Sequence, residues 1–169
     1  MTIAPIRQTQ TGRSIAALRI FFGVVFLTNG LAKLVPGIAH LPGGYFLIDS
    51  RGARNIIMHN ARHHPVGIYH DLVFNLLVPN WGLIGPMVGL TETAAGLLLV
   101  LGLASRAGAL LAAGLSFHIQ FSDANGPWLF EYAVEWVPLL CLVFMQAGRT
   151  WGLDAKLLIG QPGWRRLLA

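Results

Sequence analysis

Four long apolar stretches limit the fold of this 169-residue chain more than any other feature of its sequence. A helix needs about 20 mainly apolar residues to cross the roughly 30 Å hydrocarbon core of a bilayer. Only 11% of the residues are charged, whereas soluble domains average about 25%. We therefore predict an all-α integral membrane protein, folded as a four-helix bundle in a single domain (residues 1–169). The expected spans are Ile15–Val35, Leu83–Leu103, Ala107–Phe121 and Glu131–Ala147.

The basic residues predict the direction in which the chain crosses the membrane. Arginine and lysine are enriched in cytoplasmic loops. They occur before the first span, in the turn after the second and after the fourth, and four crossings place these three segments on one side. We therefore expect both termini in the cytoplasm (N-in/C-in). These basic residues are Arg7, Arg13, Arg106, Arg149, Lys156, Arg165 and Arg166.

The long connection between the first two spans, residues 36–81, is too polar to cross the membrane and forms an outer loop in this topology. Between Val66 and Val78 its apolar and polar positions separate at helical spacing. This pattern predicts a helix at the outer interface or across the end of the bundle. We expect the C-terminal tail, residues 153–169, to lie at the cytoplasmic interface, where Trp164 would act as an anchor.

Charge distribution and cysteine content exclude several classes of protein. The net charge is +5, but the basic residues are spread in ones and twos, so we expect no nucleic-acid partner. A single cysteine, Cys141, cannot form a disulfide framework or a four-cysteine metal site. His118 is the only histidine within a predicted span. We expect no intrinsic haem, flavin or metal.

The outer loop contains several histidines, of which His59 and His63 are four residues apart. On a helix this spacing can bind a metal. No HExxH motif accompanies the two residues, and no third ligand is evident. We therefore interpret these histidines as a surface cluster.

Glu92 is the most informative residue of the second span. Together with Glu92 itself, four glycines follow one another at spacings of three, four, three and four residues and share one helix face, and small residues allow helices in a membrane to pack closely. They are Gly82, Gly85, Gly89 and Gly96. A carboxylate near the middle of a bilayer is normally paired or protonated. Two interpretations remain open: an ion pair with Arg19 that clamps two helices, or a carboxylate that takes up and relays a proton beside a ligand.

A second group of polar residues lies near the outer ends of the predicted spans. Asn29 and Lys33 share a face of the first span, and Glu131 and Glu135 share a face at the start of the fourth. His118 lies about one turn from the outer end of the third span. We expect Lys33 and Glu131 to extend toward the interface. His118 and Glu135 either form a structural hydrogen bond or pass a proton between a bound quinol and the outer water.

Several motifs of the chain resemble those of the DoxX-like membrane proteins. LRI at 18–20 and NGLAKL at 29–34 resemble the first helix of that family. TETAAGLLL at 91–99 resembles its second helix, while AGR at 147–149 and WGLD at 151–154 resemble its ending. The resemblance covers the chain from about Arg19 to Asp154 and leaves out the outer loop.

The resemblance implies a four-helix membrane bundle. It also implies a relation to the small subunits of thiosulfate:quinone oxidoreductase, to other redox-associated proteins and to membrane partners of soluble redox enzymes. Arg19, Lys33, Glu92 and Asp154 match the polar residues typical of the family. The long outer loop departs from the family's compact form.

Two functions are compatible with the sequence. The first is a membrane subunit of a quinone-linked redox system of the thiosulfate:quinone oxidoreductase type. The residues expected to handle protons in catalysis are Glu92, His118 and Glu135. Those expected to bind the quinone cofactor or an anionic substrate are Arg19, Asn29 and Lys33. The second function is a non-catalytic accessory subunit that docks membrane or periplasmic subunits through its outer loop. Both place the chain in the lipid bilayer of a prokaryotic cytoplasmic membrane.

Overall fold

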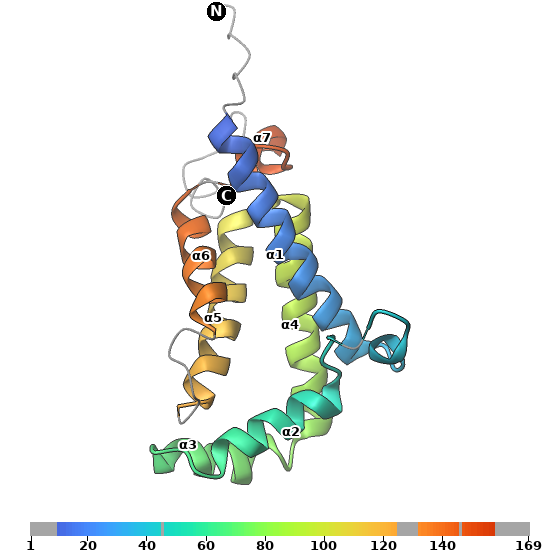
Figure 1. The fold of residues 1–169 in the computed structure, drawn as a ribbon, viewed down its shortest axis with the longest axis vertical. Helices are drawn as coiled ribbons and strands as arrows, with labels where there is room; N and C mark the ends of the chain where they lie inside the picture. Colours follow the sequence, from blue (N-terminus) through green and yellow to red (C-terminus); the bar gives the residue numbers. More distant parts are fainter. Residues whose placement is uncertain (1–9, 45, 125–131, 146, 158–169) are drawn as a thin grey trace, which may run out of the picture.

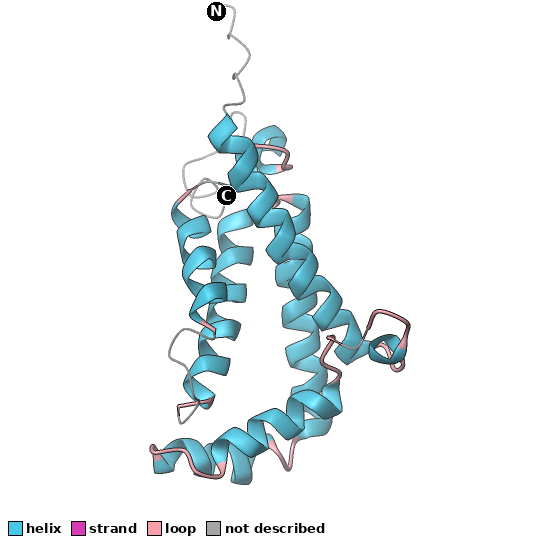
Figure 2. Ribbon diagram, viewed as in Figure 1, coloured by secondary structure: helices cyan, strands magenta, loops and turns pink. Residues whose placement is uncertain are grey.

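The computed structural model describes residues 10–44, 46–124, 132–145 and 147–157. All regular elements in these ranges are helical, which confirms the all-α prediction for this part of the chain (Figure 2). The four helices that run side by side are α1 (Gln10–Leu34), α4 (Trp81–Leu101), α5 (Ser105–Ser122) and α6 (Ala133–Phe144) (Figure 1). Helix α1 packs mainly against α4, α4 also packs against α5, and α5 packs against α6.

The connection between α1 and α4 is folded. Its elements are η1 (Ile38–His40), α2 (Ser50–Ala61), α3 (Gly67–Leu72) and the π-helical turn η2 (Val73–Leu77). Helices α2 and α3 lie across one end of the four long helices (Figure 1). The helix predicted between Val66 and Val78 is therefore present as α3 and η2. Helix α2 was missed because it has no continuous apolar run; Asp49 begins it by accepting a hydrogen bond from the Gly52 N–H at 2.6 Å.

At the opposite end, the chain after α6 returns to the start of α1. It forms η3 (Ala147–Arg149) and the short helix α7 (Asp154–Leu157) (Figure 1). The rest of the predicted interfacial tail, including Trp164, lies outside the described residues, as does Glu131.

The long helices carry apolar side chains on their outward faces. Among the described helices, α1 and α4 are long and apolar enough to cross a membrane. Phe21 on α1 is 60% exposed and Leu83 on α4 is 65% exposed. Phe144 on α6 is 80% exposed. Such broad apolar exposure is unfavourable in water but is solvated by lipid chains.

Small residues hold α1 and α4 in contact. A Cβ atom on Gly96 would lie 2.3 Å from the backbone nitrogen of Leu27, and one on Gly30 would lie 2.5 Å from that of Thr93. Because glycine has no Cβ, the two backbones touch directly. Gly85 and Gly89 are buried on the same face of α4, as predicted. The predicted fourth member of this glycine face, Gly82, instead borders open space.

Exchange of the buried and the open glycines for alanine tests this packing. Gly96→Ala forces a Cβ into the backbone of α1, and we expect a loss of about 1–3 kcal/mol in the free energy of unfolding. Gly114→Ala on α5 is the matched control, because nothing lies within 4 Å of its Cβ position. Thermal denaturation in detergent measures both variants. Equal melting temperatures for the two variants would contradict the close contact.

Candidate functional site

An ion pair is buried between the two longest helices. The Lys33 Nζ atom, in the last turn of α1, lies 2.7 Å from a carboxylate oxygen of Glu92, near the middle of α4. The two side chains are 5% and 9% exposed. Glu92 therefore faces the inside of the helix assembly, as its place among the glycines predicted.

The sequence around the pair brings the two helices close enough for it to form. A Cβ atom on Gly89 would lie 3.1 Å from the Cβ of Lys33. The Thr93 hydroxyl donates to the Gly89 carbonyl at 2.8 Å, so this polar side chain is satisfied within α4. Lys33 Nζ also donates to the Asn29 carbonyl, at 3.4 Å. Lys33 thus spans the contact between α1 and α4 with both of its partners nearby.

The predicted clamp between Arg19 and Glu92 is wrong, and so is the predicted extension of Lys33 to the interface. Arg19 precedes Lys33 by fourteen residues, which is about 21 Å along a helix. Its guanidinium is fully buried nearer the other end of α1 and donates to the Trp151 carbonyl at 3.0 Å. Lys33, and not Arg19, is the cation that pairs with Glu92.

The carboxylate of Asp154 forms a polar junction near Arg19. It accepts the backbone N–H groups of Ala104 at 2.7 Å and Ser105 at 3.0 Å, and so caps the start of α5. The Ser105 hydroxyl in turn accepts the Gly148 N–H at 3.0 Å. The negative charge of Asp154 also acts on Arg19. Arg19 therefore ties α1 to the chain after α6, and Asp154 ties the turn between α4 and α5 to it, which are structural roles.

A hollow of about 480 Å³ lies beside the ion pair, at the end of α1 and the beginning of α2. This volume falls within the range of small-molecule pockets. Its lining residues are Ala32, Lys33, Pro36, Gly37, His40, Asp49, Ser50 and Arg51. Lys33 therefore contacts both the buried carboxylate and the hollow.

Asn29, predicted to bind the cofactor, has other partners. Its side-chain oxygen accepts the Ile48 N–H and its amide nitrogen donates to the Val25 carbonyl, both at 3.1 Å. The residue anchors the segment that precedes α2. Within the described residues, it supports the wall of the hollow and is not part of its lining.

The structure gives His118 and Glu135 separate partners. The Ser116 hydroxyl donates to the Glu135 carboxylate at 2.9 Å, which links α5 to α6. His118 Nε2 lies 3.3 Å from the Tyr69 hydroxyl of α3. Burial raises the pKa of Tyr69, partly offset by a hydrogen bond with Ser122, so its hydroxyl remains protonated at neutral pH. His118 therefore contacts α3 in the connection between α1 and α4, whereas Glu135 contacts α5.

Sequence reasoning missed a polar junction between the outer connection and α5. His64 is 8% exposed, and its Nε2 lies 2.9 Å from the Phe121 carbonyl. The Asn60 amide donates to the Ser122 hydroxyl at 3.2 Å. Helix α2 ends at Ala61, so His59 and His63 do not share one helix face. In the described ranges no three His, Cys, Asp or Glu side chains gather as metal ligands.

Removal of the Asp154 carboxylate tests the junction around Arg19. Asp154→Ala leaves two N–H groups without an acceptor and the buried Arg19 without its neighbouring charge, so we expect a loss of about 3 kcal/mol or more in stability. Asp71→Ala is the control, because that carboxylate is 71% exposed. Thermal melting in detergent provides the readout. A melting temperature for Asp154→Ala as high as that of the control would contradict this role.

The comparison with protein families gives one result. The DoxX family model matches residues 14–123, which cover α1 to α5 and include Arg19, Lys33 and Glu92 but not Asp154. Comparison with curated proteins and with solved structures found no match. The matched range is well over half of the chain and contains both helices that are long enough to cross a membrane. The protein is therefore an integral membrane protein that belongs to the DoxX family.

Proposed function

We propose that this protein is the membrane subunit of a quinone-linked redox system and that Lys33 and Glu92 handle its protons. One observation carries the proposal: the lysine of a buried ion pair also lines a hollow of about 480 Å³. Ionisable residues inside a membrane are costly and mark functional sites by default. When bound, a quinone supplies a two-electron acceptor whose reduction also takes up two protons.

The chemistry of the hollow fits a quinone ring. Lys33 and Ser50 offer N–H and O–H donors for carbonyl oxygens, while Ala32 and Pro36 offer apolar surface. Lys33 holds and orients the ligand, and Glu92 exchanges a proton with Lys33 across the 2.7 Å that separates them. Lys33 lines the hollow, whereas Arg19 and Asn29 do not, so ligand binding falls to Lys33 among the three residues first expected to hold the quinone.

His118 and Glu135 complete the proposed proton route as independent groups. His118 contacts Tyr69 of the outer connection, and Glu135 contacts Ser116 between α5 and α6. His118 is solvent-exposed in the isolated chain, so it can exchange protons with outer water. In this proposal an electron donor, such as thiosulfate bound to a partner subunit on the outer side, supplies the reducing equivalents.

The proposal includes four crossings of a prokaryotic cytoplasmic membrane by α1, α4, α5 and α6, with both termini inside. The start of α1, the turn between α4 and α5 and the chain after α6 meet at one end, where Arg19 contacts Trp151 and Asp154 caps α5. Arg13, Arg106 and Arg149 belong to these three segments. Their shared end supports a cytoplasmic location under the positive-inside rule.

A second candidate is a non-catalytic accessory subunit of a larger membrane complex. One observation favours it: Lys33 and Glu92 neutralise each other and join α1 to α4. A mutual clamp of this kind needs no ligand to justify its presence. Under this alternative the outer connection is the docking surface for membrane or periplasmic partners.

Neutral substitutions at the ion pair distinguish the two candidates. Lys33→Met and Glu92→Gln each leave one charge buried without a partner, and we expect each to lower the melting temperature. The double variant Lys33→Met/Glu92→Gln removes both charges, so its stability recovers. If the pair handles protons, the stable double variant still loses at least about 100-fold in the rate of quinone reduction.

The measurement uses membranes that contain the full chain with its native partners, and short-chain ubiquinone and menaquinone analogues as acceptors. Asp71→Asn, on the exposed outer surface, serves as the activity control. Recovery of both stability and quinone reduction in the double variant would support the accessory role. That result would exclude the proposed proton site.

Cysteine labelling tests the proposed topology. In a Cys141→Ser background, we expect Arg62→Cys to react with a membrane-impermeant maleimide in intact cells. Ser14→Cys and Arg149→Cys react only after the membrane is opened, because both lie at the opposite end of the bundle. Labelling of Ser14→Cys or Arg149→Cys in intact cells would contradict the arrangement with four crossings and both termini inside.

A further inference from the structure

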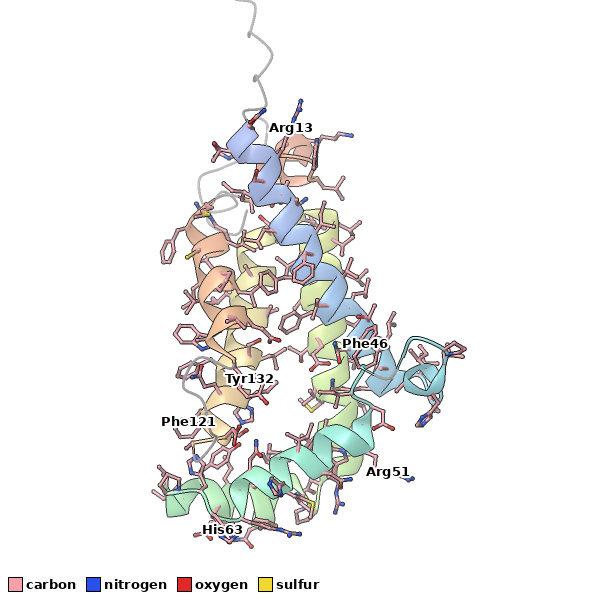
Figure 3. All side chains as sticks on the ribbon, in the orientation of Figure 1. Arg13, Phe46, Arg51, His63, Phe121 and Tyr132 are labelled. Atoms are coloured by element: carbon pink, nitrogen blue, oxygen red, sulfur yellow. The ribbon has the colours of Figure 1, made fainter. Side chains whose placement is uncertain are left out.

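Three arginines and a histidine follow one another along helix α2 and its C-cap residue. Arg51, Arg54, His59 and Arg62 occur at spacings of three to five residues, and Arg51, His59 and Arg62 are exposed. Figure 3 shows Arg51 at the outer edge of the molecule, beyond the four long helices. In the described part of the chain none of the three arginines forms an ion pair. We call these four residues the basic row.

A hollow of about 280 Å³ lies along the basic row. It is lined by Asn55, Met58, His59 and Arg62. Arginine presents a planar fork of N–H donors that matches phosphate oxygens, and an asparagine amide and an imidazole add further donors. The two carboxylates nearest in sequence have partners of their own. Asp49 accepts the Gly52 N–H, and Asp71 Oδ1 lies 3.2 Å from His70 Nδ1.

The neighbouring element has the opposite character. Ile68, Leu72 and Leu76 are four residues apart along α3 and η2 and are 83%, 42% and 52% exposed. Between them, Tyr69 and Val73 are buried in a small core with Ala61 of α2. The outer unit formed by α2, α3 and η2 therefore places a basic row and an apolar row on two helices that are packed together.

The chain also fixes where this outer unit lies. It begins soon after α1 ends at Leu34 and leads into α4 at Trp81, so it stays at the ends of the two membrane-length helices. The Trp81 indole N–H donates to Ser50, with both the carbonyl and the hydroxyl of that residue at 3.1 Å. A basic row beside an apolar row at the membrane boundary is the pattern of a segment that lies in the lipid interface.

We propose that the outer unit is a binding site for anionic phospholipid. Arg51, Arg54 and Arg62 bind headgroup phosphates, with the hollow of α2 holding one of them, while Ile68 and Leu72 enter the acyl region. An acidic protein partner would use the arginines but would leave the adjacent apolar row exposed to water. Lipid accounts for both rows. The inference depends on the membrane location of the protein and not on quinone chemistry.

Two pairs of exposed arginines, one at each end of the bundle, give a matched test. The delipidated full-length protein in detergent is titrated with phosphatidylglycerol or phosphatidylcholine, and native mass spectrometry reads the bound lipid. We expect wild type to prefer phosphatidylglycerol by at least about tenfold, and Arg51→Gln/Arg62→Gln to lose most of this preference. Arg13→Gln/Arg149→Gln keeps it. The double variant Ile68→Ser/Leu72→Ser weakens the binding of both lipids equally.

Other outcomes would overturn the proposal. Equal binding of the two lipids by wild type, or an unchanged preference in Arg51→Gln/Arg62→Gln, would exclude an anionic-lipid site on α2. Displacement of phosphatidylglycerol by millimolar inorganic phosphate would indicate a site for free anions. Loss of a co-purifying acidic protein from the arginine variant, with lipid binding intact, would assign the row to a protein partner. Thermal melting confirms that each variant is folded.

Discussion

The direct contact between the backbones of α1 and α4 is the interaction on which the rest of the structure depends. Lipid chains are as apolar as leucine side chains, so helices in a bilayer gain little from burying apolar surface against each other. They gain from close packing, and Gly30, Gly89 and Gly96 make it possible here. The same closeness lets Lys33 reach Glu92. Without it, each charge would be buried alone at a cost of several kcal/mol.

Polar contacts supplement this packing mainly at the two ends of the long helices. At the end where α5 begins, Asp154 caps α5 and Arg19 reaches the carbonyl of Trp151. At the opposite end, Asn29 and Trp81 fix the beginning of the connection between α1 and α4, and His64 fixes its middle to α5. The contact of Lys33 with Glu92 differs from these, because it is a direct salt bridge between two side chains near the middle of α4. This difference separates the candidate site from the structural junctions.

The sequence predicted the long helices and the inward direction of Glu92 because apolar length and glycine spacing are local properties of the chain. It did not predict which cation would meet Glu92. Arg19 and Lys33 both lie on α1, and the choice between them depends on the level at which α4 crosses α1, which is a tertiary property. For the same reason the sequence did not predict the partner of Asn29. This partner, the backbone N–H of Ile48, belongs to a loop whose path no periodicity reveals.

Helix α2 was missed for a different physical reason. Its apolar residues Ile57 and Ala61 are four residues apart and pack against Tyr69 and Val73, but they form only a short stripe in a mostly polar segment that begins at the capping Asp49. Such a short stripe is easily overlooked beside four long apolar runs, although its helical spacing is present in the sequence. Its arginines were therefore placed only within the long polar connection, although they follow one another along α2 and its C-cap.

The outer connection also relates the two proposed sites to each other. Arg51 belongs to the basic row and lines the hollow beside Lys33. The bond between Trp81 and Ser50 fixes the start of α2 against the start of α4. A phospholipid held by the basic row would therefore lie next to the hollow and add its negative charge close to Lys33. The electrostatic potential at Lys33 then depends on two negative groups, the carboxylate of Glu92 and the headgroup of the lipid.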